Sequence, residues 1–173
     1  MDGREAAVSW GTKTIQGQVY DLRHLDPFAM VVAPKDGSAA LNVRVSFGLH
    51  TFAREWLPTD PLDHRMQRDS DVRCFCPARY SLSLQLPGIV RAAASGNAHF
   101  SRGANYLLVR DVGGTPYAVF FSMQKARASR LDVVMYVDSA YLKPLLPKKL
   151  PTIGFGVLTQ KVANGQPISR PKK

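Results

Sequence analysis

The chain has 173 residues, with 23 Lys and Arg against 13 Asp and Glu, a net charge of +10, and 45% hydrophobic residues. This size and composition argue against a two-domain enzyme and predict one globular domain, residues 1–163, followed by a flexible basic tail, residues 164–173. The sequence contains no apolar run of about 18 residues and no basic and apolar leader at its N-terminus. We therefore expect no membrane span and a cytoplasmic location.

Positive charge is concentrated in the C-terminal half of the chain. Residues 1–71 hold 8 basic and 10 acidic side chains, whereas residues 123–173 hold 10 and 2. A surface of this kind is typical of proteins that bind phosphates, and a solubilising tail is the alternative. We predict nucleic acid as the partner, with RNA favoured, and an acidic inhibitor or assembly protein as a second partner that would cover the same face. The predicted nucleic-acid contacts are Arg44, Arg127, Arg130, Lys143, Lys148 and Lys149.

The first half of the chain predicts two strands and a long loop. Residues 1–19 indicate an arm or a peripheral strand, and the apolar residues between Val19 and Val32 indicate a first strand that ends near Val32. Leu41 to Phe52 gives the clearest period-two alternation in the chain, which predicts a half-buried strand. Residues 53–71 are rich in proline and charge, so we expect a loop there.

The second half predicts one helix and three strands. After a short strand at Val72–Cys76, apolar spacing predicts an amphipathic helix over residues 81–95, kinked at Pro87 or beginning only near Leu86. Gly113 and Gly114 predict a tight hairpin between strands 106–112 and 117–123, and a strand at 131–137 completes an antiparallel meander. Prolines after Tyr141 argue against further long elements.

Together these elements predict an α+β fold. It consists of an antiparallel sheet of four to six strands packed against one main helix, with a proline-rich basic C-terminal extension.

The two cysteines, Cys74 and Cys76, are separated by one residue, so a relaxed disulfide between them is not expected. With His50 and His64 they offer ligands for zinc, but the spacing matches no structural-zinc pattern, and burial in a strand is the alternative. We therefore predict neither a metal nor a cofactor.

Three residues are predicted to carry a catalytic role. The alternation that buries Leu49 places His50 on the polar face of its strand, where an imidazole can transfer protons at neutral pH, or serve only as a structural histidine. Arg79 lies at a strand-to-helix junction suited to phosphate, although Ser81 or Ser83 there can simply cap the helix. Tyr141 closes the last strand and can position a base or a proton, or belong to the core.

The usual signatures of several enzyme classes do not occur in the sequence. It contains no phosphate-binding Walker loop, no dinucleotide-binding glycine pattern, no Gly-x-Ser-x-Gly and no His-Glu-x-x-His. Nucleotide hydrolysis, dinucleotide redox chemistry, esterase activity and zinc-protease activity therefore have no support from these patterns.

The chain is small and basic, and a helix is followed by antiparallel strands, with a histidine on a strand. Over about residues 41–141 this layout resembles the barnase/RelE-type bacterial toxin ribonucleases. The resemblance implies metal-independent RNA cleavage by His50, Arg79 and Tyr141, with Arg44 a weaker candidate, whereas the acidic loop before Val72 departs from that plan. The stretches 45–52 and 137–141 also look similar to uncharacterised bacterial proteins. We predict a metal-independent endoribonuclease of toxin or antiphage-defence type. A non-catalytic RNA- or DNA-binding module, or a small subunit of a nucleoprotein assembly, is the alternative.

Overall fold

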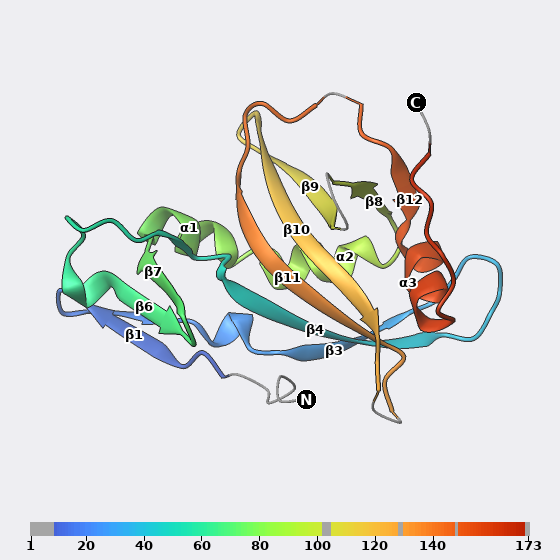
Figure 1. Cartoon of the computed structure of the whole chain (residues 1–173), viewed down its shortest axis with the longest axis horizontal. Helices are drawn as coiled ribbons and strands as arrows, with labels where there is room; N and C mark the ends of the chain where they lie inside the picture. The colour runs from blue at the N-terminus through green and yellow to red at the C-terminus, as the bar shows by residue number, and fades with distance from the viewer. Residues whose placement is uncertain (1–8, 102–104, 128–129, 148, 172–173) are drawn as a thin grey trace.

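A computed structural model describes residues 9–101, 105–127, 130–147 and 149–171, which form three sheets and three α-helices (Figure 1). The largest sheet has seven strands, in the spatial order β12 (Thr152–Gly154), β8 (Asn97–Phe100), β9 (Tyr106–Val112), β10 (Thr115–Lys125), β11 (Val133–Leu142), β4 (Leu41–His50) and β3 (Phe28–Val32). A three-stranded sheet has the order β5 (Ala53–Glu55), β7 (Asp71–Phe75) and β6 (Arg65–Arg68), and β1 (Thr12–Ile15) pairs with β2 (Gln18–Asp21). The helices are α1 (Pro77–Ser83), α2 (Leu86–Ala93) and α3 (Phe155–Ala163), and short 3-10 turns occupy Arg23–Leu25 and Leu62–His64.

Strand β4 confirms the clearest prediction from the sequence. Val43, Val45 and Phe47 are buried, while Arg44 and Ser46 between them are only partly buried, as successive side chains of a strand point to opposite faces. The buried side chains pack in one continuous core with β10, β11, α2 and α3. The opposite face of β4 is therefore the polar face, and it includes His50.

The predicted hairpin is also confirmed. Strands β9 and β10 pair antiparallel, and Gly113 and Gly114 between them have φ values of 59° and 82°. Positive φ at both turn positions is what a two-residue turn of type I′ requires, and glycine adopts it without a Cβ clash. Strand β11 then pairs antiparallel with β10, which completes the predicted meander.

The predicted fold class is wrong, because the large sheet is mixed rather than antiparallel and contains seven strands. Strand β11 pairs in parallel with β4, about ninety residues earlier in the chain, with Val133 opposite Val43 and Val137 opposite Phe47. A parallel pair requires a long connection, and here the connection includes the three-stranded sheet, α1, α2 and the meander. The pattern within each strand carries no information on such a distant partner.

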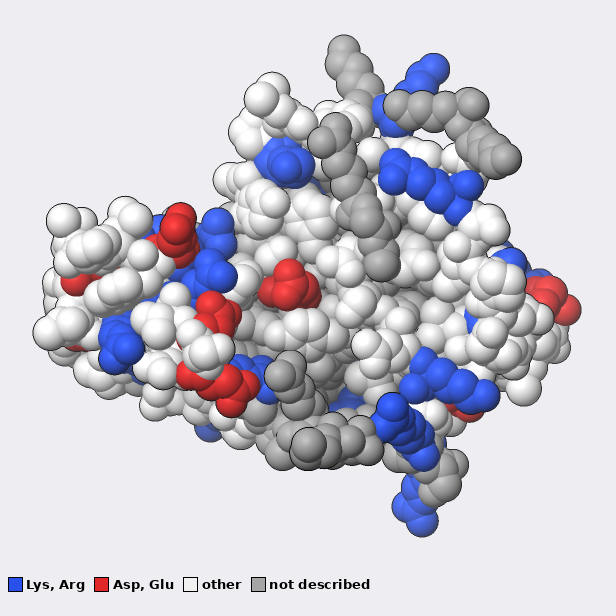
Figure 2. Space-filling view, viewed as in Figure 1, with Lys and Arg blue, Asp and Glu red and all other residues white. Residues whose placement is uncertain are grey.

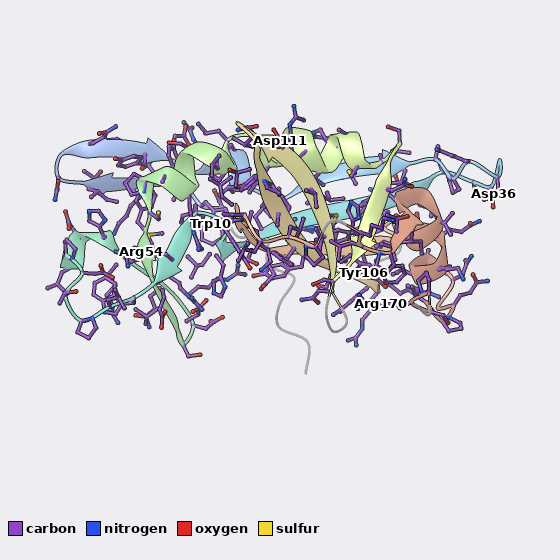
Figure 3. The ribbon with its side chains drawn as sticks, turned by 90° about the horizontal axis from the view of Figure 1, so that it is seen from above. Trp10, Asp36, Arg54, Tyr106, Asp111 and Arg170 are labelled. Carbon is purple, nitrogen blue, oxygen red and sulfur yellow. The ribbon has the colours of Figure 1, made fainter. Side chains whose placement is uncertain are left out.

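Residues 53–71 were expected to form a loop, but they contribute two strands of the second sheet. β5 and β6 pair with opposite edges of β7, at Ala53 opposite Phe75 and at Gln67 opposite Val72. The polar composition misled the prediction, because composition does not reveal that two of these charged side chains form an ion pair. Arg54, labelled in Figure 3, donates hydrogen bonds to both carboxylate oxygens of Asp60, at 2.9 and 2.5 Å.

The Arg54–Asp60 pair predicts a pH dependence of stability. The Arg54 guanidinium, with the Leu57 main-chain N–H, lowers the pKa of Asp60 from 3.8 to about 2. A carboxylate with a depressed pKa in the folded state stabilises the fold above pH 3.8, and this contribution is lost as the pH falls to about 2. We expect Asp60→Asn to be less stable than the wild type at pH 6, with the difference shrinking as the pH falls below 3.8. Urea unfolding of both proteins between pH 6 and pH 2.5 measures this difference, and a gap that widens on acidification contradicts the prediction.

The predicted single helix over residues 81–95 is two helices. α1 begins earlier, at Pro77, and α2 begins at Leu86, where Pro87 lies in the first turn and costs no internal hydrogen bond. Leu84 and Gln85 separate the two helices, and the start of α2 agrees with the predicted alternative in which a helix begins near Leu86. Leu86, Ile89 and Val90 are buried against the large sheet.

The predicted proline-rich extension is wrong as well, because the segment between Pro151 and Pro167 folds into the domain. β12 pairs with β8, and α3 buries Phe155 and Leu158, with the Phe155 ring 6.0 Å from that of Phe121. The prolines flank α3 instead of interrupting it. Beyond it, Ile168 packs against the core and Arg170 donates a hydrogen bond to the Ser101 carbonyl at 3.1 Å (Figure 3). Lys172 and Lys173 lie outside the described residues, and the division at residue 164 stays a prediction.

The helices leave one face of the large sheet without helical cover. Figure 1 shows α2 behind β10 and β11 and α1 to their side, with no helix in front of these strands. Because Phe121 points into the core toward α3, its neighbour Phe120 points to the opposite face. No helix among the described residues has the length and apolar character needed to cross a membrane.

Candidate functional site

His50 is the last residue of β4, and it lies directly opposite Ser139 of β11. Its side chain is 28% exposed, and its Nε2 atom lies 2.8 Å from Oδ2 of Asp71. A carboxylate can only accept this hydrogen bond, so Nε2 carries the proton and a neutral ring presents Nδ1 as the acceptor. No hydrogen bond joins Nδ1 to another described residue. His50 is thus held in one tautomer and one orientation while its second nitrogen remains available.

Asp71 and Arg73, both on β7, complete the surroundings of His50. Asp71 accepts a hydrogen bond from Nε of Arg73 at 2.7 Å through its other oxygen. Desolvation raises the pKa of Asp71, but the hydrogen bonds from Arg73 and His50 together outweigh it and lower this pKa below the usual value. Sequence reasoning missed both residues because it assigned Asp71 to a solvated acidic loop. The short strand pattern at residues 72–76 was the available signal. Extended by one residue, it places the side chains of Asp71 and Arg73 on the same face of a strand.

Arg79 lies on α1 and reaches back to the end of β4. Its Nη1 group donates hydrogen bonds to the carbonyl of Ala53 at 2.8 Å and to that of His50 at 3.4 Å. The guanidinium also lies over the ring of Tyr141, 5.3 Å from the ring centroid. Its Nε and Nη2 groups make no hydrogen bond to a described residue, so N–H donors remain for an anion beside the imidazole.

The position of Tyr141 depends on an irregularity in β11. The register shifts between Val137 and Ser139, so that Val137 and Ala140 are both buried while Ser139 and Tyr141 face outward. The Tyr141 ring stacks beside Phe120 with ring centroids 5.5 Å apart, and Nζ of Lys143 lies 5.8 Å from its centroid. Without the bulge, strict alternation would turn Tyr141 to the other face.

The structure thus brings together the three residues predicted to be catalytic, from three separate elements. Arg79 contacts the main chain of His50 and the ring of Tyr141, and His50 is bonded to a carboxylate that also holds Arg73. We call His50, Asp71, Arg73, Arg79 and Tyr141 the His50 site. An oriented imidazole combined with two nearby arginines can join proton transfer to the binding of a phosphate or another anion.

The residues predicted to bind nucleic acid come from different parts of the fold. Lys143 belongs to the end of the sheet that holds the His50 site. Arg44 lies opposite Val134 at the other end of β4, the same end as Arg127 and Arg130 in the connection between β10 and β11. Lys149 precedes β12, and Lys148 lies outside the described residues. On the face shown in Figure 2, Lys and Arg side chains lie around the large sheet, an acidic patch lies over that sheet, and most other acidic side chains lie over the smaller sheets.

The cysteines do not form part of this site. Cys74 is buried, and burial raises the pKa of its thiol. His64 places its Nδ1 3.2 Å from the Phe75 carbonyl. Within the described ranges, no three His, Cys, Asp or Glu side chains converge in a way that could hold a metal ion.

A second histidine contact, between His24 and Ser83, is structural. Nε2 of His24 lies 2.8 Å from Oγ of Ser83, but Ser83 is fully buried and also donates to the Tyr80 carbonyl. A nucleophile in this position would be out of reach of a substrate. Neither Ser83 nor Ser81 caps the N-terminus of α1, because Ser81 donates to the Pro77 carbonyl inside the helix.

The side chains of His50, Asp71 and Arg73 are 28%, 41% and 27% exposed, so the site is open to solvent. A groove of about 390 Å³ lies elsewhere, between α2 and the strands β8 and β9, and its polar lining includes Asn97, His99 and Arg110. None of the residues predicted to be catalytic lines it. An exposed site suits a polymeric substrate better than a small enclosed one.

Comparison with known proteins identifies a family but no activity. The model of the YjaZ family matches residues 12–163, which include all three sheets and all three helices. No curated protein and no solved structure matches the chain. The similarity to uncharacterised bacterial proteins is thereby supported, whereas the resemblance to barnase/RelE-type ribonucleases receives no support from these comparisons. Because the match extends over most of its length, the chain belongs to the YjaZ family.

Proposed function

We propose that this protein is a metal-independent endoribonuclease of the toxin or antiphage-defence type, active in the cytoplasm, with the His50 site as its catalytic centre. The observation that carries the proposal is the convergence of an oriented imidazole, two guanidinium groups and a phenol on one exposed surface. Each of these groups has a role in phosphodiester cleavage that needs no metal ion.

The reaction uses the 2′-hydroxyl of RNA as the nucleophile. Nδ1 of His50 removes the proton of this hydroxyl, and the resulting imidazolium is stabilised by the Asp71 carboxylate. The 2′-oxygen then forms a bond to phosphorus while the bond from phosphorus to the 5′-oxygen breaks. The 5′-oxygen takes a proton from the Tyr141 hydroxyl, which solvent restores. The products are a 2′,3′-cyclic phosphate and a free 5′-hydroxyl.

The two arginines stabilise the charge that develops on the phosphate oxygens. Arg79 has donors left over after its two bonds to main-chain carbonyls, and these bonds fix its position. Arg73 is held by Asp71, the carboxylate that also binds the imidazole. Preorganised donors of this kind are the usual source of transition-state stabilisation at phosphate. Lys143, beside Tyr141, adds positive charge for binding the backbone.

A non-catalytic RNA- or DNA-binding module is the second candidate function. The observation that favours it is the structural use of Arg79, whose contacts with two carbonyls and an aromatic ring would stabilise the fold in the absence of any substrate. In such a protein the basic side chains would bind the phosphates of the nucleic acid. An acidic partner protein could bind the same side chains instead of the nucleic acid.

The test is incubation of the purified full-length protein with end-labelled single-stranded RNA in the presence of EDTA. The proposal predicts fragments that end in a 2′,3′-cyclic phosphate, and DNA of the same sequence stays intact because it lacks the nucleophile. Salt-dependent binding of RNA without cleavage supports the second function instead. Cleavage that EDTA abolishes contradicts the proposed mechanism.

A further inference from the structure

A row of side chains leads from His50 across the uncovered face of the large sheet. His50 lies opposite Ser139, and Ser139 lies opposite Phe120, so the three share one face of three adjacent strands. The next residue in the row, Leu107 of β9, is buried. The accessible part of the row therefore consists of an imidazole, a hydroxyl and an aromatic ring.

The aromatic end of this row has the composition of a surface for stacking bases. Phe120 is only partly buried, and its ring is nearly parallel to that of Tyr141, at an interplanar angle of 24°. Apolar aromatic rings on a sheet face lose contact with water when a flat ring covers them, and every nucleobase offers such a ring.

The charges beside these rings determine which flat molecule fits. The guanidinium of Arg79 and the ammonium of Lys143 both lie within 6 Å of the Tyr141 ring centroid, at 5.3 and 5.8 Å. Positive groups next to an aromatic surface suit a ligand that joins an anion to a planar ring, which is the arrangement in a nucleotide. An uncharged aromatic ligand or a peptide would leave these cations without a counterpart.

The spacing connects this surface to the proposed catalytic centre. Adjacent strands lie about 4.8 Å apart, so Phe120 is about 10 Å from His50 along the row. This distance is comparable with the size of one nucleotide. A strand of RNA with its reactive phosphate at His50 can therefore place a neighbouring base on Phe120, with the Ser139 hydroxyl facing the ribose or the edge of the base.

We propose that Phe120, with Tyr141 and Ser139 beside it, is a subsite that stacks one base of single-stranded RNA; this proposal rests on the proposed function of the His50 site. Double-stranded RNA is excluded as the ligand, because its bases are stacked on one another inside the helix and cannot cover a ring on the protein. The subsite makes the protein selective for unpaired segments while tolerating different base sequences.

Fluorescence titration of the full-length protein tests the subsite directly. The probe is a single-stranded RNA of ten nucleotides with 2′-O-methyl riboses, which cannot be cleaved, and one central 2-aminopurine, whose emission falls when the base is stacked. The wild type should bind the strand and quench the emission, and a duplex of the same length should bind more weakly. Phe120→Leu keeps the apolar volume but removes the aromatic face, and should weaken binding of the single strand by about 5-fold to 100-fold.

The matched control is Ser122→Ala, on the same strand and the same face but outside the row, since Ser122 lies opposite Tyr136. Its affinity and quenching should equal those of the wild type.

Should Phe120→Leu prove unfolded by circular dichroism, Tyr141→Leu takes its place with the same expected loss. A folded Phe120→Leu or Tyr141→Leu protein with unchanged affinity and quenching overturns the subsite, as does equal affinity for the duplex. Cleavage of unmodified RNA by the wild type, measured in parallel, shows whether the catalytic proposal survives such a result.

Discussion

Replacing His50 with alanine should lower the rate of RNA cleavage by about 10²- to 10⁴-fold, the range expected for the loss of a general base. The variant removes Nδ1, the atom proposed to accept the proton of the 2′-hydroxyl, and leaves the guanidinium groups of Arg73 and Arg79 in the site. RNA affinity should therefore change little while turnover falls. Initial rates on a labelled single-stranded RNA, with binding measured separately on its uncleavable 2′-O-methyl form, distinguish the two quantities.

His64 provides the matched control for this experiment. It lies on the turn before β6 and is not among the contacts of the His50 site, so His64→Gln should retain the wild-type rate.

Asp71→Asn probes the tautomer of His50. A side-chain amide that donates to Nε2 would force the ring proton onto Nδ1 and remove the base, so cleavage should fall although the imidazole is present. Full activity in His50→Ala would refute the assignment of the base.

Substitution of Gly48 with alanine should lower the free energy of unfolding by about 1 to 3 kcal/mol, the usual cost of an overpacked site. Gly48 lies in β4, where an added Cβ would meet the hydroxyl of Tyr136, the Cζ of the same ring at 3.0 Å, and the carbonyl oxygen of Asp138 at 3.1 Å. The carbonyl belongs to the bulge that orients Ser139 and Tyr141. We therefore expect both a lower Tm and weaker RNA cleavage.

Gly88 in α2 is the matched control, because nothing lies within 4 Å of a Cβ added there. In a helix, alanine is favoured over glycine by about 1 kcal/mol, so Gly88→Ala should leave Tm unchanged or raise it. Thermal unfolding followed by circular dichroism measures both variants, with a Tm change of roughly 2 to 4 °C expected for each kcal/mol. Equal Tm values for Gly48→Ala and the wild type would contradict this prediction, since they would show that β4 and β11 accommodate the added methyl group without loss of stability.

Local periodicity determined that β4, β9, β10 and β11 would be strands, and in β4 it also determined which side chains would be buried. The alternation in β4 depends only on neighbouring residues, and it placed His50 on the polar face. The hairpin at Gly113 and Gly114 is likewise local, because two adjacent glycines make positive φ inexpensive. The selection of His50, Arg79 and Tyr141 used only residue chemistry and position at the ends of elements, and in the fold Arg79 contacts both the main chain of His50 and the ring of Tyr141.

Only the tertiary structure decided which strands pair and which charges neutralise one another. The parallel pairing of β11 with β4 joins residues about ninety positions apart, and the energy of that pairing comes from shared burial that no local pattern encodes. Residues 53–71 looked like a loop because their charges are visible in the sequence while the Arg54–Asp60 pair is not. The pairing of Asp71 with His50 is likewise not visible in the sequence, because it depends on the second sheet, which holds β7 beside the end of β4. The sequence by itself thus determined the elements with a strong local pattern and the chemistry they carry, whereas long-range packing determined β5, β6, α3 and the sheet order, and completed the site.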